Sequence, residues 1–246
     1  MTAVLVIAGT DSSGGAGLTR DVQVLGALGC EAMCAVTAVT AQSDELLRAT
    51  LHVPAHLVSA QIAAAFATRR IAAIKIGMLG TAATVQAVLE NIPPRDVVPL
   101  VLDPVLASSS GAALLDAEGL EALRTRLLPR ATLLTPNLPE AAQLLNEPPA
   151  TNSAELERQG RALLAMGAGA VLMKGGHATG ATATDLLLVK GAMARSFSAP
   201  RLAGAHRGTG CALASAIAAG LAHGRPLPEA CEHAKRHVTE LLRRAR

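Results

Sequence analysis

The stretch 205-AHRGTGCALASAIAAG-220 gives the strongest indication of the fold, because a glycine-rich turn leads directly into a run of small helix-forming residues. Gly208 and Gly210 lack a Cβ, so the backbone there can turn sharply and approach a ligand closely. From Cys211 to Gly220 the residue types favour a helix. The first N–H groups of a helix are unpaired within it and attract negative charge. The stretch predicts a phosphate-binding helix N-terminus with a Cys211 thiol of lowered pKa, or else a turn with a small buried cysteine.

Composition limits the class of protein. The chain has 246 residues, half of them apolar, which suits a single α/β domain over residues 1–246. Aromatic residues make up 1%, with no Trp or Tyr, so the aromatic platforms of a base-stacking nucleic-acid surface are missing. The net charge is +3, and the basic residues at 234–246 are typical of a solvated helix whose last turn is basic.

The first residues and the spacing of the cysteines indicate the cellular compartment in which the protein works. The opening MTAVLVIAGT has no basic segment before its short apolar run, so it predicts a buried first strand and not a signal peptide. No apolar run approaches membrane-spanning length. The four cysteines follow no C-x-x-C or zinc-ligand spacing, which favours a reducing cytoplasm.

Short apolar runs alternate with longer alanine-rich stretches along the chain. The predicted strands are Val4–Ala8, Met33–Ala38, Ala73–Ile76, Leu100–Leu102, Leu133–Thr135 and Ala170–Met173. The predicted helices are Ala16–Leu28, Ala55–Thr68, Ala82–Glu90, Ala117–Leu127, Leu138–Leu145, Ala154–Met166, Cys211–Leu221 and Pro228–Leu242. The strands are nearly continuous apolar runs, which indicates a mostly parallel sheet covered by helices on both faces. Around Lys190-Gly191, two strand-like runs predict a late antiparallel hairpin.

Polar clusters follow the predicted strands, at the edge of the sheet where such folds bind ligands. The first is AGTDSSGGAGLTRD, a glycine-rich loop that is neither a dinucleotide fingerprint nor a Walker A sequence. The amide of Gln42, after the second strand, can pair with the edge of a heterocycle. Met78, after the third strand, can pack against a flat ring.

The remaining clusters carry the charges that phosphoryl transfer uses. Asp103 ends the fourth strand, Asn137 and Glu140 lie within one helical turn after the fifth, and Lys174 ends the sixth. Carboxylates that hold Mg²⁺, a lysine near phosphates and a helix N-terminus are the usual parts of such a site. Taken singly, Glu140 also fits a surface charge and Lys174 a side chain that reaches to solvent. Their joint occurrence at successive strand ends favours a phosphotransferase.

Seven motifs, in this order along the chain, resemble those of the hydroxymethylpyrimidine/phosphomethylpyrimidine kinases of thiamin biosynthesis. These are AGTDSSGGAGLTRD, TAVTAQ, KIGML, LDPV, TPNLPEA, VLMKGGH and GTGCALASAIAAG. The resemblance extends from residue 3 to about residue 222. It implies a ribokinase-like three-layer α/β/α fold, the use of ATP and Mg²⁺, and a homodimer. The implied reaction phosphorylates 4-amino-5-hydroxymethyl-2-methylpyrimidine and then its monophosphate.

The resemblance also assigns roles to individual residues of this sequence. Substrate binding falls to Gln42, which would hold the aminopyrimidine, and to Gly9, Asp21 and Met78. Glu140, Asp103 and Asn137 would organise Mg²⁺, while Lys174, Asn137 and Arg207 would meet ATP. Gly208, Thr209 and Gly210 would form the anion hole, with Cys211 beside them as the catalytic residue. Cys211 would accept the proton of the substrate hydroxymethyl group, or else only shape the pocket.

Two positions depart from the family pattern. Arg207 replaces the histidine that usually precedes Gly-Thr-Gly-Cys, and Ser43 replaces an asparagine after Gln42. A permanent cation at position 207 could grip a phosphate and change how the monophosphate substrate is handled. Two other functions stay open at this point, a pyridoxal-type kinase of the same fold and a protein that binds the pyrimidine without catalysis.

Overall fold

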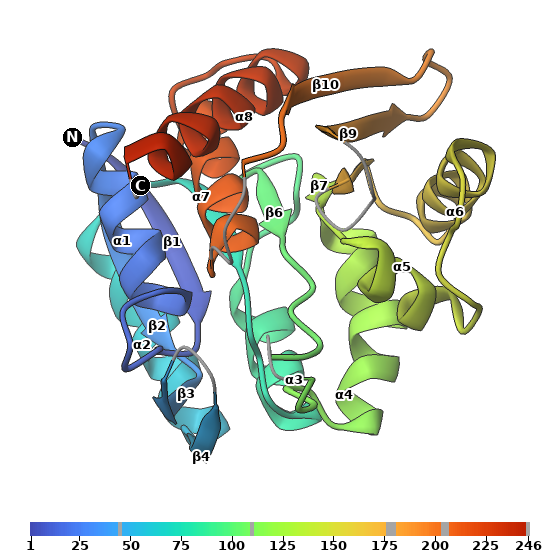
Figure 1. Ribbon diagram of the computed structural model, residues 1–246. Coiled ribbons are helices and arrows are strands. Elements are labelled where there is room, and N and C mark those ends of the chain that lie inside the picture. Colours follow the sequence, from blue (N-terminus) through green and yellow to red (C-terminus); the bar gives the residue numbers. More distant parts are fainter. Residues whose placement is uncertain (44–45, 109–110, 176–180, 203–206, 245–246) are drawn as a thin grey trace.

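The centre of the molecule is an eight-stranded sheet with the order β10-β9-β8-β7-β6-β5-β1-β2 (Figure 1). The computed structural model describes residues 1–43, 46–108, 111–175, 181–202 and 207–244. The strands of the sheet are β1 (Thr2–Ala8), β2 (Cys30–Val36), β5 (Ile71–Ile76), β6 (Leu100–Leu102), β7 (Leu133–Leu134), β8 (Ala170–Met173), β9 (Thr182–Val189) and β10 (Arg195–Pro200). From β2 to β8 neighbouring strands are parallel, and β9 pairs antiparallel with both β8 and β10.

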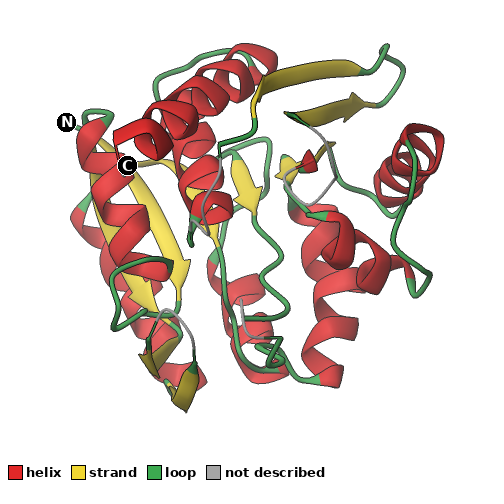
Figure 2. Cartoon of the chain, in the orientation of Figure 1, coloured by secondary structure: helices red, strands yellow, loops and turns green. Residues whose placement is uncertain are grey.

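Helices cover both faces of the sheet (Figure 2). One face packs against α1 (Gly17–Ala27), α7 (Thr209–Ala222) and α8 (Leu227–Arg244). The other packs against α2 (Ala55–Thr68), α3 (Ala82–Asn91), α4 (Ala117–Ala122), α5 (Leu138–Leu145) and α6 (Ser153–Ala165). After α4 the chain continues through a π turn, Leu123–Leu127, and a 3-10 turn, Leu128–Arg130. The three-layer α/β/α arrangement predicted from the sequence is confirmed.

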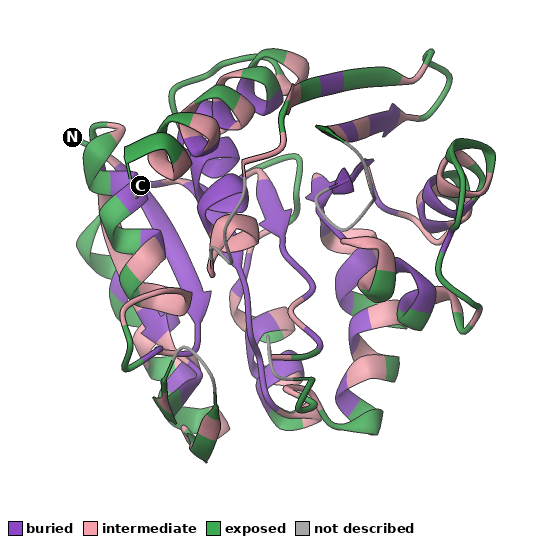
Figure 3. Ribbon diagram, in the orientation of Figure 1, coloured by how far each residue is buried: buried purple, intermediate pink, exposed green. Residues whose placement is uncertain are grey.

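The first strand shows why its sequence is an unbroken apolar run. Leu5 and Ile7 belong to the core on the α2 side of the sheet, while Val4 and Val6 belong to the core on the α7 side. All four are 0% exposed, and the strands of the sheet interior are buried (Figure 3). Because both faces are covered, no polar residue is needed at alternate positions. The parallel strands therefore end in a common edge, where the loops gather.

A second sheet, of two strands, was not predicted. The strand expected over Met33–Ala38 ends at Val36, and after Thr37 the chain forms β3 (Ala38–Gln42), which pairs antiparallel with β4 (Leu47–His52). Val39 lies opposite Leu51, and both are exposed. Strand β3 has only two buried residues and β4 has none, so neither shows the alternating or continuous apolar pattern that predicts a strand. The late hairpin, by contrast, is confirmed as β9 and β10.

Along the described ranges, none of the helices has the combined length and apolar character that crossing a membrane demands. Cys30, Cys34, Cys211 and Cys231 are all free thiols.

Candidate active site

A cavity of about 630 Å³ lies along the C-terminal ends of the parallel strands. This volume is within the usual range of about 300–1,000 Å³ for small-molecule sites. The residues expected at the site that line this cavity are Gly9, Gln42, Met78, Asp103, Asn137, Glu140, Lys174, Arg207, Gly208, Thr209, Gly210 and Cys211. The strand ends thus bring together residues that are far apart in the sequence, as the parallel topology requires.

Asp21 is the exception, and its expected contact with substrate is corrected. Its side chain points from α1 into the protein, is fully buried, and is not among the groups that line the cavity. One carboxylate oxygen accepts a hydrogen bond from Lys75 at 2.7 Å, and the other accepts one from Ser215 at 2.7 Å. Asp21 therefore does not face the cavity but holds Lys75, which does line it.

The expected pyrimidine end of the cavity is formed by the loop after β1 and by β3. A Cβ on Gly9 would stand 2.9 Å from the Met78 sulfur, so glycine is needed for Met78 to occupy its place. The Ser12 hydroxyl donates to the Gln42 carbonyl at 2.8 Å, and the Gln42 N–H donates to the same hydroxyl at 2.7 Å. These bonds use the backbone of Gln42 and fix the end of β3 beside the loop that follows β1.

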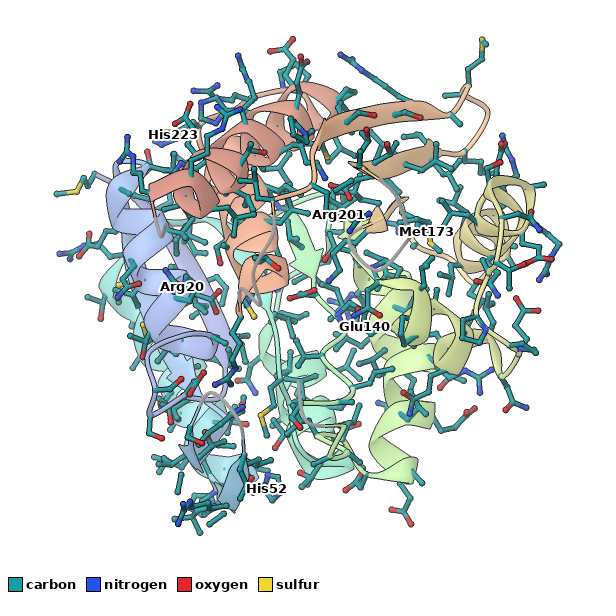
Figure 4. All side chains as sticks on the ribbon, in the orientation of Figure 1. Arg20, His52, Glu140, Met173, Arg201 and His223 are labelled. Carbon is teal, nitrogen blue, oxygen red and sulfur yellow. The ribbon has the colours of Figure 1, made fainter. Side chains whose placement is uncertain are left out.

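The N-terminus of α5 is closed by its own side chains. The Asn137 side-chain oxygen accepts the Glu140 N–H at 2.8 Å, and the Glu140 carboxylate accepts the Asn137 N–H at 2.7 Å. This reciprocal capping box was missed, although Asn-x-x-Glu at a predicted helix start is its sequence signature. Figure 4 labels Glu140 on the first turn of α5. Burial raises the pKa of Glu140 to about 7, with Lys174 opposing and Asp103 adding to the rise.

Lys174 lies between two carboxylates. Its ammonium is 2.7 Å from Asp103 and 3.5 Å from Glu140, and the Thr135 hydroxyl also donates to Asp103 at 3.2 Å. Burial alone would raise the pKa of Asp103, but Lys174 and Lys75 hold it below its ordinary value. Burial alone would lower the pKa of Lys174, yet Asp103 and Glu140 raise it. Lys174 and Asp103 are therefore both charged at neutral pH.

These groups fit a magnesium ion that arrives with phosphates. Across the residues that the structure describes, no group of three or more His, Cys, Asp or Glu side chains could hold a metal by itself. Mg²⁺ is usually bound through one or two carboxylates together with substrate phosphates and water. Asp103 and Glu140 supply two carboxylates at one side of the cavity, whereas the side-chain oxygen of Asn137 already caps α5.

The N-terminus of α7 is open. Gly208 has a φ of 70°, and a Cβ there would stand 2.1 Å from the Gly15 carbonyl oxygen, so only glycine fits. In the described part of the chain, no side chain caps this helix. A Cβ on Gly210 would stand 3.1 Å from the Lys174 ammonium nitrogen, so the helix end and this cation are neighbours. Backbone N–H groups beside a lysine favour an anion.

Cys211 lines the cavity as predicted, but the predicted lowering of its pKa is wrong. Burial raises the pKa of the Cys211 thiol to about 12, although Lys75 and a hydrogen bond from the Gly17 backbone act in the opposite direction. The negative charges of Asp21 and Asp103 add to the rise. The helix N-terminus is visible in the sequence, whereas this burial is not. The thiol therefore keeps its proton at neutral pH.

Arg207 joins three segments around the cavity. Its guanidinium donates to the Asp11 carboxylate at 3.2 Å, to the Ser13 hydroxyl at 3.2 Å and to the Ser43 carbonyl at 2.6 Å. The loop after β1, the end of β3 and the start of α7 are thereby connected. Contact of Arg207 with a phosphate stays a prediction. The motif residues Gly176, His177 and His206 lie outside the described residues.

The sheet order and the lysine, carboxylates and open helix end at its edge define a ribokinase-like phosphotransferase. Pyridoxal kinase from Staphylococcus aureus, in complex with AMP-PCP and pyridoxal, superposes with a TM-score of 0.86 at 29% identity, covering 97% of this chain and 87% of that chain. Phosphomethylpyrimidine kinase from Clostridium difficile 630 gives a TM-score of 0.84 at 35% identity, covering 98% of this chain and 100% of that chain.

Sequence similarity defines the family more narrowly. The phosphomethylpyrimidine kinase family model matches residues 11–246. The hydroxymethylpyrimidine/phosphomethylpyrimidine kinase of Salmonella typhimurium is 43% identical over 242 residues, which is 98% of this chain and 91% of that relative. The chain belongs to the phosphomethylpyrimidine kinase family. Its relatives are kinases, which confirms the expected class of enzyme.

Proposed function

We propose that the protein transfers the γ-phosphoryl group of ATP to the hydroxymethyl group of 4-amino-5-hydroxymethyl-2-methylpyrimidine, and a second phosphoryl group to the resulting monophosphate. The observation that supports this most is that one cavity joins two unlike ends. Gln42, Gly9 and Met78 form an end suited to a flat ring with polar edges. Lys174 and the open start of α7 form an end suited to phosphates.

The residues divide the work of phosphoryl transfer. Lys174 and the N–H groups at Gly208–Gly210 hold phosphate oxygens, while Asp103 and Glu140 would hold Mg²⁺. When bound, Mg²⁺ would neutralise negative charge on the phosphate oxygens of ATP. In the first transfer, the hydroxymethyl oxygen forms a bond to the γ-phosphorus, the bond to the ADP oxygen breaks, and the alcohol proton passes to Cys211 in the small fraction of the protein that holds it as thiolate. A thiol with a pKa of about 12 gives a strong base that is scarce at neutral pH.

Incubating the protein with Mg-ATP and each of three substrates, namely the pyrimidine alcohol, its monophosphate and pyridoxal, tests the function. The pyrimidine alcohol and its monophosphate should both be phosphorylated, and faster than pyridoxal. Faster turnover of pyridoxal would overturn the proposal in favour of a pyridoxal-type kinase. Binding of the pyrimidine without turnover would show that the protein is not a kinase of this substrate.

The pyrimidine end of the cavity is tested by Gln42→Ala. Calorimetry should show a loss of about 1–3 kcal/mol in the free energy of pyrimidine binding with ATP affinity unchanged, because a hydrogen bond to the ring edge is lost.

The assembly proposed is a homodimer of single-domain chains that works in the cytoplasm, where Cys211 stays reduced. One core draws on elements from β1 to β9 and the other on elements from β1 to α8, which supports one domain over residues 1–246. The β3–β4 sheet exposes Val39 by 49% and Leu51 by 70%, and a second copy of the chain would cover them. Light scattering of Leu51→Glu, compared with the parent, should then show the dimer shifted to monomer.

A further inference from the structure

An ion pair lies buried beneath the candidate active site. Lys75 on β5 and Asp21 on α1 are both 0% exposed, and their charged atoms are 2.7 Å apart. Ser215 on α7 donates to the second oxygen of Asp21, so three elements share the pair. Buried ion pairs contribute little net stability compared with apolar residues of similar size. Their presence under a site therefore calls for a role beyond holding the fold together.

The ion pair is joined through Ser215 to α7, one helical turn after Cys211. Ser215 follows Cys211 by four positions on α7, which places both on the same face of the helix. The Gly17 backbone, at the start of α1, hydrogen-bonds the Cys211 sulfur. Lys75 lines the cavity that holds Cys211, and a Cβ on Gly77 would stand 2.9 Å from its ammonium nitrogen. The elements α1, β5 and α7 thus converge below the sulfur.

The charges that act on Cys211 come from four directions. Lys75 on β5 and Asp21 on α1 form one pair, while Asp103 after β6 and Lys174 after β8 form another at 2.7 Å. Among these charges Lys75 acts most strongly on the thiol, ahead of Asp21. Burial alone would lower the pKa of Lys75, but Asp21, Cys211 and Asp103 raise it, so Lys75 stays cationic.

We propose that Lys75 is a positioning residue of this site, whose ammonium, fixed by Asp21 and Ser215, stabilises the thiolate form of Cys211. The ammonium is 0% exposed and is held by Asp21 at 2.7 Å, so its charge stays in place throughout the reaction. Its value for catalysis rests on the proposed function, in which Cys211 accepts the proton. The effect on the thiol is a property of the free protein and can be measured without turnover.

The test uses two substitutions that break the same ion pair but leave opposite charges. Lys75→Met removes the cation and keeps the length of the side chain, while Asp21→Asn removes the anion and keeps its shape. The rate of iodoacetamide alkylation, in which the thiolate sulfur bonds to carbon and iodide leaves, is followed by mass spectrometry of the Cys211 peptide between pH 8 and 9. Lys75→Met should slow alkylation of Cys211 by about tenfold or more, and Asp21→Asn should accelerate it several-fold.

Loss of packing would give a different result from loss of charge. If the ion pair served only the fold, both variants would loosen the protein and accelerate alkylation together, and this outcome would overturn the proposal. Cys231, buried on α8, serves as the internal control for loosening, and its rate should not change.

Two further comparisons keep the test decisive. Should Lys75→Met not fold, Asp21→Asn is compared with the double variant Asp21→Asn/Lys75→Met, since these two differ only in the cation. Equal Cys211 rates in that pair would also overturn the proposal. Phosphorylation of the pyrimidine alcohol is assayed separately with the parent protein. Its absence would refute the proposed function while leaving opposite alkylation shifts as evidence for the role of Lys75.

Discussion

Helices α5 and α7 both begin at the cavity, but the backbone N–H groups of their first turns differ in whether side chains cap them. The start of α5 is closed, because Asn137 and Glu140 satisfy each other's N–H groups. The start of α7 has the left-handed Gly208 at its N-cap position, and within the described ranges no side chain caps it. The closed end presents a carboxylate to the cavity and the open end presents backbone N–H groups. One wall is thus suited to a cation and the other to an anion.

Local sequence accounts for both ends. At α5 the sequence Asn-Leu-Pro-Glu puts a capping oxygen, a proline in the first turn and an acceptor at the required spacing. At α7 a side chain at position 208 would collide with the Gly15 carbonyl, so the helix must start on a glycine. A glycine cannot cap with a side chain, so the requirement for close packing is also what leaves the helix end open.

The largest effect should follow from changing the open end. Cys211→Ala should lower kcat by roughly 10²–10⁴, the usual contribution of a positioned general base, with little change in substrate binding. Cys211→Ser should be nearly as impaired, because a hydroxyl ionises at far higher pH than a thiol. Steady-state kinetics measures both variants, and near-parental kcat in the serine variant would assign Cys211 to packing.

The pH profile sharpens the same prediction. Because the pKa of Cys211 is about 12, the thiolate fraction of the free protein grows about tenfold per pH unit from neutral pH upward. The parent kcat/KM should therefore rise from pH 7 to pH 9, and the rise should be absent from Cys211→Ser.

The closed end is tested next by Glu140→Gln. The substitution removes one negative charge from the proposed metal site but keeps an oxygen that can accept the Asn137 N–H. The Mg²⁺ concentration for half-maximal rate should increase by about tenfold or more. Titration of activity with Mg²⁺ measures this. Overlapping curves for parent and variant would show that Glu140 only caps α5.

Stability as a function of pH gives a second, smaller effect at the closed end. The pKa of Glu140 is raised from 4.5 to about 7, so the folded state binds its proton more tightly than the unfolded state. Stability from this group is present below pH 4.5 and is lost as the pH rises to about 7. Without Mg²⁺, the parent should lose on the order of 1–3 kcal/mol relative to Glu140→Gln over this window. Urea unfolding at several pH values checks it, and parallel profiles would contradict it.

The smallest expected effect is a difference in the free energy of unfolding between variants at the two helix ends. Asn137→Ala removes the cap of α5 and should lower the free energy of unfolding by about 1 kcal/mol. Thr209→Ala, in the first turn of α7, removes no cap and should change it by less than about 0.5 kcal/mol. Chemical denaturation compares the two variants, and equal losses would mean that Thr209 stabilises α7 as Asn137 stabilises α5.

Elements bounded by clear turn residues were predictable from the sequence. The helices Ala55–Thr68 and Leu138–Leu145 and the strand Ala170–Met173 have the predicted boundaries, because each is a regular apolar pattern next to a proline, an asparagine or a glycine. The β3–β4 sheet was missed because its strands lack a second covering layer. The alternation of strands and helices along the chain was enough to predict the fold class.

The candidate site was predictable as a set of positions but not as a set of charge states. The candidate residues could be assigned to one edge of the sheet, and all of them line the cavity except Asp21, which lies on α1. The thiol of Cys211 was expected to ionise easily, yet burial reverses this, and the charges that act on it most strongly belong to Lys75 and Asp21, more than a hundred residues earlier. Such effects depend on tertiary contacts that no local pattern contains.

The contact of Gly15 with Gly208 has a consequence for how the protein is made. Strand β1 emerges from the ribosome long before α7, which packs against β1 and α1. Until then the apolar face of β1 that bears Val4 and Val6 lacks its final cover. Contacts of such long sequence separation slow folding and lengthen exposure to aggregation. The core on this face of β1 is therefore complete only after α7 has been synthesised, and the same helix brings its first turn to the cavity.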